Sequence, residues 1–310
     1  MRYKIEKYIS IAIIIGFIIV VVIAVGKRVK EDSQIGETSK WTETELIEQI
    51  AMAKQSIESK YRHIEIYYDN WERQETFKYN MSDNKKNILK GLEATEKIIE
   101  RLPSGMIEEG FDTRKGKYES IYGNADDHTT KINIILCSKI VEASGDDAGL
   151  IYNDHRNKMY NIYIAVDGGG NIGQCLAHEL YHFFYCRISM QNLIGEFYSQ
   201  EEWQRELPYE FSYYETAVPK DNTYTILTEN NMENVYFVTA YSKTRDAEDK
   251  CELFSYLLST DEKSDLPRAY KSSHVKKRVK MIIDEIDEYF DTVDENAYWN
   301  KIYNEKVLNY

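Results

Sequence analysis

An uncharged run near the N-terminus, Ile9 to Gly26, does most to limit what this chain can fold into. At 18 residues it is close to the length that crosses a bilayer as one helix, so we expect a transmembrane anchor there. Residues 1–8 would form a short tail before it, and the polar residues 27–41 would form a stalk after it. The remainder is then a folded body delivered to a membrane.

The orientation of this segment is less constrained, because three basic residues precede the run and three follow it closely. We expect the N-terminus inside the cell and the body outside, at the membrane surface. A signal peptide is the alternative, with Ala24 and Gly26 as the small residues of its cleavage site. Cleavage there would make the body a secreted protein.

The composition limits the kinds of partner that the folded body can bind. A net charge of -13, from 52 acidic and 39 basic residues, opposes contact with a phosphate backbone, so we exclude nucleic acid as a partner. The four cysteines form no CxxC pair, which predicts buried thiols and leaves a single disulfide open. They are Cys137, Cys175, Cys186 and Cys251.

Helical periodicity dominates residues 42–117. Thr42 and Glu45 have the spacing of a capping box at the start of a helix, and an apolar stripe that includes Ile47 follows them. A second helix is predicted from Asp83 to Arg101. We therefore expect residues 42–117 to form a helical region before the rest of the body.

Residues 118–310 have a different pattern. Lys131 to Ile140 and Met159 to Val166 are rich in β-branched and aromatic residues, which predicts two strands. Asp167 to Gly170 would turn the second strand into a helix. Helices are predicted for residues 171–186, 245–258 and 273–290.

The first of these helices contains the segment AHELYH, from Ala177 to His182. Residues four apart share a helix face, so His178 and His182 can both offer an imidazole nitrogen to one tetrahedral zinc ion. Glu179 would act as general base on a water molecule that the metal activates. A helix with two partly buried histidines and a surface glutamate is the structural alternative.

A catalytic zinc site needs a third protein ligand and one open position. The extended metzincin pattern is excluded, because Tyr185 and Ile188 stand where it requires Gly and His. Glu201 or Glu202 has the spacing of a thermolysin-like ligand, but the surrounding segment SQEEWQR lacks the Asn-Glu and Ser-Asp residues that are expected around such a ligand. The third candidate is Glu248.

Four residues around Glu248 carry a family resemblance. Tyr241 lies seven residues before Glu248, and Glu252 and Phe254 follow it. This pattern resembles anthrax lethal factor and related extracellular gluzincins, in which a Tyr precedes the zinc-ligating Glu by seven residues and an E-x-x-x-E-x-F arrangement follows. The resemblance covers about residues 85 to 290, and its two metal segments are its specific parts.

The resemblance implies a role for each matched residue. Glu248 would be the third zinc ligand, Tyr241 would hydrogen-bond the oxyanion or the leaving group, and Glu252 would support a ligand from behind. Asp246 and Asp249 flank Glu248 and stay open as alternative ligands. Cys251 and Lys250 depart from the family, which commonly has Ala and often an apolar residue at these positions.

The segment from His178 to His182 is an HExxH motif, and its predicted helix is called the HExxH helix below. Three glycines at the start of this helix also form a GxGxxG pattern: Gly168, Gly170 and Gly173. This is the setting of a dinucleotide fingerprint. No convincing second strand with a terminal acidic residue follows about twenty positions on, as that fingerprint requires. We therefore interpret the glycines as a tight turn into the helix.

Taken together, these patterns predict an α+β, zincin-like metallopeptidase domain over residues 118–310, preceded by the helical region and one transmembrane helix. We expect a zinc-dependent endopeptidase that acts on a protein or peptide substrate, which would add to the edge strand of the sheet. A non-catalytic membrane-anchored binding protein with a structural or vestigial metal site is the alternative. A metal hydrolase with a non-peptide substrate is a third hypothesis.

Overall fold

The computed structural model describes residues 41–73, 75–111, 130–142, 145–154, 159–192, 200–215, 224–225, 234–261 and 264–310. The predicted tail, the anchor and all but the last residue of the stalk lie outside these ranges. Within them, every helix is too short or too polar to cross a bilayer. The chain divides into two compact units, Met1–Gln49 and Ile50–Tyr310, with the boundary inside α2 (Glu43–Lys60).

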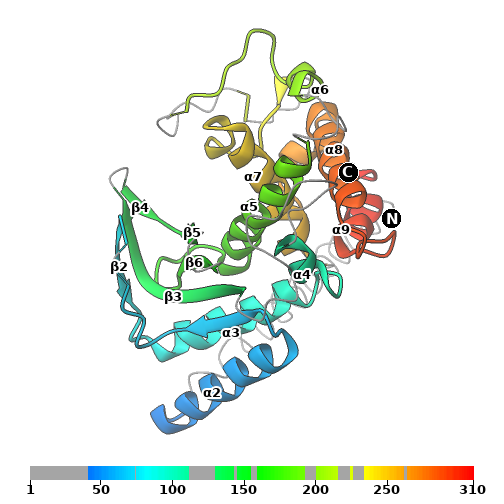
Figure 1. Ribbon diagram of the computed structural model, residues 1–310. Coiled ribbons are helices and arrows are strands. Elements are labelled where there is room, and N and C mark those ends of the chain that lie inside the picture. The colour runs from blue at the N-terminus through cyan, green and yellow to red at the C-terminus, as the bar shows by residue number, and fades with distance from the viewer. Residues whose placement is uncertain are drawn as a thin grey trace, which may run out of the picture. The chain divides into compact units, whose positions relative to one another are not determined.

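A mixed sheet of six strands is built from the described part of the second unit (Figure 1). The parallel strands β1 (Ile64–Tyr67), β3 (Lys131–Glu142) and β6 (Met159–Ala165) are neighbours in that order. The edge strand β5 (Gly149–Asp154) runs antiparallel to β6. The short strands β2 (Lys78–Met81) and β4 (Gly145–Asp147) pair antiparallel with the later part of β3.

Both faces of the central strand are covered, which explains why β3 is a nearly continuous apolar run. Leu136 on one face lies against Gly91 of helix α3 (Lys85–Ile99). Ile135 and Cys137 on the opposite face pack in a buried cluster with Phe77. The sheet therefore has helices on one side and a layer of largely aromatic side chains on the other.

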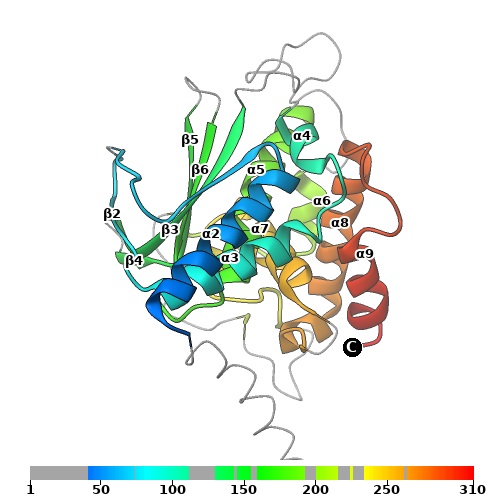
Figure 2. The same ribbon diagram turned by 90° about the horizontal axis from the view of Figure 1, so that it is seen from below.

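The helices place two long elements next to each other. Helix α5 (Ile172–Asn192) and helix α7 (Asp246–Ser259) lie side by side between the sheet and α8 (Ser273–Tyr289) in both views (Figure 1, Figure 2). The shorter elements are α4 (Met106–Phe111), α6 (Gln200–Arg205), η3 (Tyr241–Lys243), η4 (Arg268–Lys271), α9 (Tyr298–Ile302) and η5 (Tyr303–Val307).

The α+β class and most of the expected elements are confirmed. Thr42 and Glu45 form the predicted capping box, with the Thr42 backbone N–H donating to Oε2 of Glu45 at 2.7 Å and the Glu45 N–H donating to Oγ1 of Thr42 at 3.3 Å. The predicted place of Ile47 on the apolar stripe is wrong, because its side chain is 51% exposed. Ile47 follows the buried Leu46 directly, and adjacent helical residues point about 100° apart.

The region predicted to be helical, residues 42–117, also supplies β1 and β2 to the sheet. Each of these strands has only four residues, too few for a periodic pattern to stand out. Both are held by pairing with β3, which lies more than fifty residues later in the chain. Their strand conformation thus comes from tertiary contacts.

Two buried ion pairs fix α7 against α8. Asp249 pairs with Arg278, and both side chains are fully buried. Lys250 donates to both carboxylate oxygens of Glu285 at 3.1 Å. The ring of Trp203 lies 4.9 Å from the Lys250 ammonium and 5.2 Å from the Arg278 guanidinium. Because buried charges are costly unless paired, these contacts fix the rotation of α7 about its axis.

Arg278→Met should lower the free energy of unfolding by about 3–5 kcal/mol, because it leaves the carboxylate of Asp249 buried without its partner. Lys277→Met is the matched control on the same helix. Its ammonium is largely exposed and pairs with Glu206, so its loss should cost less than about 1 kcal/mol. Urea unfolding of both variants measures the difference, and equal losses would contradict the role given to the buried pair.

Candidate metal centre

The turn between β6 and α5 determines where the HExxH helix begins. Asp167 accepts hydrogen bonds from Ser82 Oγ at 2.9 Å and from Asn87 Nδ2 at 2.8 Å, which ties the turn to the start of α3. Gly169 has a φ of +73°, a conformation that favours glycine. Asn171 Oδ1 accepts a hydrogen bond from a backbone N–H three residues on and so caps α5. In the structure the glycine-rich segment therefore makes the turn into α5.

Helix α7 brings Glu248 opposite both histidines of α5. Its Oε2 lies 3.0 Å from Nε2 of His178 and 3.3 Å from Nε2 of His182. The two imidazole rings are 5.0 Å apart. His178 is buried, while His182 and Glu248 are half-buried. Three side chains that the sequence analysis selected thus converge on one point between two helices.

The distances between these atoms match the size of a zinc ion. Metal–ligand distances of about 2.0–2.2 Å in a tetrahedral site hold the ligand atoms about 3.3–3.5 Å apart. The observed separations of 3.0 and 3.3 Å from the carboxylate oxygen to the two nitrogens require adjustments of only a few tenths of an ångström. The donor set and its spacing therefore fit zinc.

Glu252 fixes the orientation of the His178 ring. Its Oε1 lies 3.0 Å from Nδ1 of His178, and its Oε2 accepts a hydrogen bond from Thr239 Oγ1 at 2.8 Å. Histidines that ligate metals almost always donate their second ring N–H in this way. One helix thus contacts both ring nitrogens of His178, through Glu248 and, one turn later, Glu252.

The same contacts determine how His178 and Glu248 titrate without a metal ion. Burial lowers the pKa of His178, but hydrogen bonds to Glu248 and Glu252 outweigh burial and raise the pKa to about 10. Burial raises the pKa of Glu248, but the two histidines outweigh it and hold that pKa well below its usual range. The metal-free centre is therefore an ion pair, and a cation must displace its proton.

Glu179 lies under the edge strand of the sheet. Its side chain is buried next to His178 on α5, and a Cβ built on Gly149 of β5 would lie 2.9 Å from its Oε1. The absence of a side chain at this position lets the strand pass directly over the carboxylate.

Tyr241, on η3, borders the open side of the cluster. Its ring centroid lies 5.8 Å from that of His178, and its side chain is 40% exposed. The ring is therefore both next to the cluster and accessible to solvent.

The competing candidates have other surroundings. Asp249, directly after Glu248, pairs with Arg278 on the α8 side of α7. Glu201 is highly exposed on α6, where it pairs with Arg205. Asp249 and Glu201 therefore pair with arginines and not with the two histidines.

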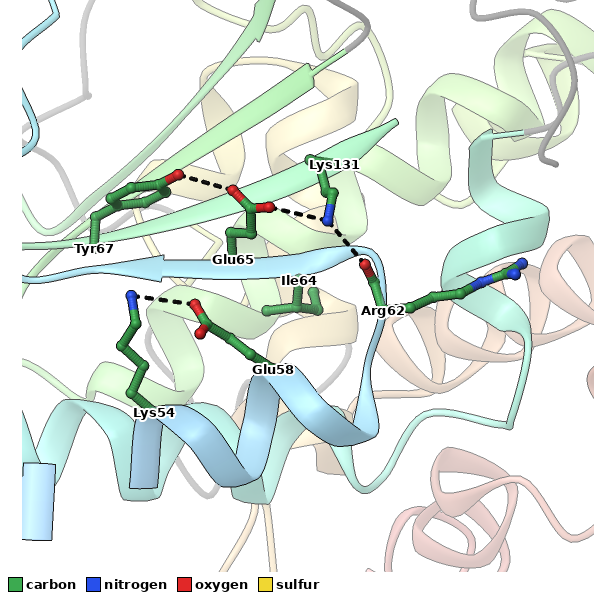
Figure 3. A pocket seen from close by; sticks show the side chains of 7 residues that line it. All are labelled: Lys54, Glu58, Arg62, Ile64, Glu65, Tyr67 and Lys131. Atoms are coloured by element: carbon green, nitrogen blue, oxygen red, sulfur yellow. Dashed lines mark hydrogen bonds and ion pairs between the residues drawn. The ribbon is translucent and has the colours of Figure 1, made fainter. Parts of the chain in front are cut away.

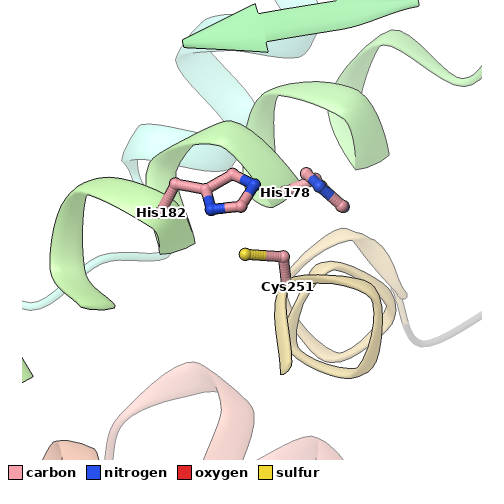
Figure 4. Close-up of side chains that lie close together, drawn as sticks. All are labelled: His178, His182 and Cys251. Atoms are coloured by element: carbon pink, nitrogen blue, oxygen red, sulfur yellow. The ribbon is translucent and has the colours of Figure 1, made fainter. Parts of the chain in front are cut away.

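Cys251 is a member of the cluster that the sequence analysis treated only as a packing position. It is fully buried, and its Sγ lies with one ring nitrogen each of His178 and His182 in a group whose atoms are all within 4.8 Å of one another (Figure 4). Burial, with the charges of nearby carboxylates that include Glu248, raises the pKa of the thiol. The available signal was its spacing, since Cys251 follows Glu248 by three residues and shares its helix face. All four cysteines are free.

A separate hollow of about 380 Å³ lies between α2 and β1 (Figure 3). Lys54 pairs with Glu58 on the same wall, helix α2, at 3.2 Å, and Lys131 of β3 pairs with Glu65 of β1 at 2.9 Å (Figure 3). The charges of these four residues therefore neutralise one another.

Comparison with known proteins adds no support for a function beyond the geometry of the site. No protein-family model, curated protein or solved structure matches this chain.

His178→Asn should change how the stability of the metal-free protein depends on pH. The folded-state pKa of His178, about 10, lies above the value near 6.5 of an unfolded histidine. Its charged form therefore stabilises the fold fully below about pH 6.5, and this stabilisation is lost as the pH rises toward 10. Urea unfolding with a chelator present should show the native-minus-variant difference shrinking over that range. A difference that stays constant would contradict the ion pair.

Proposed function

We propose that this chain is a zinc metalloendopeptidase of the gluzincin type. The observation that supports it best is the carboxylate oxygen of Glu248 at 3.0 and 3.3 Å from the imidazole nitrogens of His178 and His182. Two imidazoles and one carboxylate, with a fourth position left for water, are the ligands of catalytic zinc in thermolysin-like hydrolases. The α+β fold around these residues agrees with a zincin-like domain.

Each residue of the site would have its own role in peptide hydrolysis. When bound, zinc would lower the pKa of a water molecule and polarise the scissile carbonyl. Glu179, beside the two histidines, would take a proton from the attacking water and pass it to the departing amine. Tyr241 would donate a hydrogen bond to the carbonyl oxygen as negative charge develops there. Glu252 would hold His178 in its ligating orientation.

The edge strand favours an extended polypeptide as the substrate. Strand β5 ends the path of hydrogen-bonded strands among the described residues, and its first residue, Gly149, lies against Glu179. An extended peptide can add to such an edge through main-chain hydrogen bonds. A scissile bond beside Gly149 would then lie within reach of Glu179.

A membrane location is part of the proposal through the apolar run 9–26, which lies outside the described residues. It would place the catalytic body on the extracytoplasmic side, or release it there if the segment is a cleaved signal. The charge of -13 agrees with a partner other than nucleic acid.

A non-catalytic metal protein is the second candidate, and Cys251 is the observation that favours it. Structural zinc sites are closed by four protein ligands, and the Cys251 thiol, which lies in one group with the two histidines, offers a donor in addition to Glu248. Metal analysis of the purified full-length chain, combined with digestion of a peptide library, separates the candidates. The peptidase proposal expects one zinc per chain and cleavage that a chelator abolishes, whereas bound zinc without cleavage in both the native chain and Cys251→Ala supports the second candidate.

Glu179→Gln should reduce peptide hydrolysis by at least about 10²–10⁴-fold, because the general base is lost while the metal ligands stay. Zinc content should remain that of the native chain. Glu201→Gln, an exposed substitution on α6, is the control and should leave both quantities unchanged. Full activity in Glu179→Gln would overturn the mechanism.

Gly149→Val should lower kcat while zinc stays bound. A side chain at this position would meet the Glu179 carboxylate at about van der Waals contact or closer, with its Cβ 2.9 Å from Oε1, and push that carboxylate aside. Gly170→Ala is the control, since a Cβ there meets nothing within 4 Å. Steady-state kinetics on one cleaved peptide compare the two variants. Equal kcat values would contradict the need for a residue without a side chain at position 149.

A further inference from the structure

Four potential donor side chains meet between α5 and α7, one more than a catalytic metal site requires. His178 and His182 lie one turn apart on α5, and Glu248 and Cys251 lie three residues apart on the facing side of α7. The carboxylate of Glu248 contacts both imidazoles, and the Cys251 thiol points toward them (Figure 4). The two histidines are therefore shared by two different third donors.

The surroundings of Cys251 differ from those of a thiol that only fills space. A buried free cysteine usually behaves as a small hydrophobe among apolar neighbours. The charged groups that act on Cys251 include the carboxylates of Glu179, Glu248 and Glu252. Its side chain is fully buried, and its sulfur lies in one group with a ring nitrogen of each of the two histidines.

The distances allow the thiol to reach a metal ion held by the histidines. Zinc bonds of about 2.3 Å to sulfur and 2.0–2.1 Å to nitrogen place sulfur and nitrogen about 3.5 Å apart in a tetrahedral site. The sulfur and the two ring nitrogens already lie within 4.8 Å of one another. A shift of at most about 1.3 Å closes the difference, which a small movement of the side chain and helix can supply.

We propose that Cys251 is a fourth protein ligand, which closes the resting metal centre together with His178, His182 and Glu248. The proposal rests on the zinc peptidase function argued above and adds its regulation. A tetrahedral centre with four protein ligands has no position for water. Hydrolysis then requires the sulfur to leave, and the resting enzyme is inactive until it does.

The exchange is balanced without an oxidant or a reductant. When the metal–sulfur bond forms, the thiol proton passes to solvent. When that bond breaks, the sulfur takes a proton back and a water molecule can enter the vacated position. Binding of a substrate along β5, or another event that moves α7 against α5, is the step that would favour the open form.

Cobalt(II) substitution of the full-length chain tests the sulfur bond directly, because thiolate coordination adds a charge-transfer absorption in the near ultraviolet. Native protein should show this band, and both Cys251→Ser and Cys251→Ala should lack it. Cys186→Ser is the control, since Cys186 is a half-buried cysteine on α5 outside the cluster, and this variant should keep the band. Because the native spectrum decides by itself, failure of a variant to fold leaves the test intact.

The outcomes separate this inference from the proposed function. Visible cobalt d–d bands without the sulfur band would overturn the role of Cys251 and leave the metal centre standing. Absence of any bound cobalt would overturn both. Cys251→Ala should also weaken metal binding by about tenfold or more, since even the loss of residues behind a ligand commonly costs 10–100-fold. Its hydrolysis rate per bound metal ion should rise, and an unchanged or lower rate would contradict a closed resting state.

Discussion

The contact of one Glu248 oxygen with an imidazole nitrogen from each of two helical turns is the constraint on which the rest of the structure depends. It joins α5, which follows the central part of the sheet, to α7, about seventy residues later in the chain. A half-buried carboxylate and two imidazoles, one of them buried, are unfavourable without mutual pairing or a metal ion. The convergence of these groups at ligand spacing is therefore the observation on which the proposed cation site rests.

Polar side chains of helix α7 have partners on two sides of the helix, on α5 and on α8. Glu248, Cys251 and Glu252 face the histidines of α5, while Asp249 and Lys250 pair with residues of α8. Rotation of the helix would break both sets of contacts together. The buried ion pairs thus position the donor atoms, and Gly149 of the edge strand β5 lies against Glu179. The candidate metal ligands, the packing of α7 and the edge strand thus meet in one small region.

Local patterns predicted the elements that carry their own signal. The HExxH helix, the apolar strands and α8 have strong periodicity or composition, and they lie within two residues of the expected bounds, except that the HExxH helix continues six residues beyond Cys186. β1 and β2 were missed because pairing with β3 gives them their conformation. The proximity of Glu248 came from a family resemblance, since no local rule joins residues seventy positions apart. Cys251 was missed as a donor because a thiol on an interior helix face also suits simple packing.

The most direct measurement is anomalous X-ray diffraction at the zinc absorption edge from crystals of the purified chain. The ligand set predicts one strong peak between α5 and α7, about 2.0–2.2 Å from Nε2 of His178, Nε2 of His182 and an oxygen of Glu248. A peak elsewhere, or a Glu248 side chain turned away with no other acidic group in its place, would contradict the metal centre and the function proposed from it.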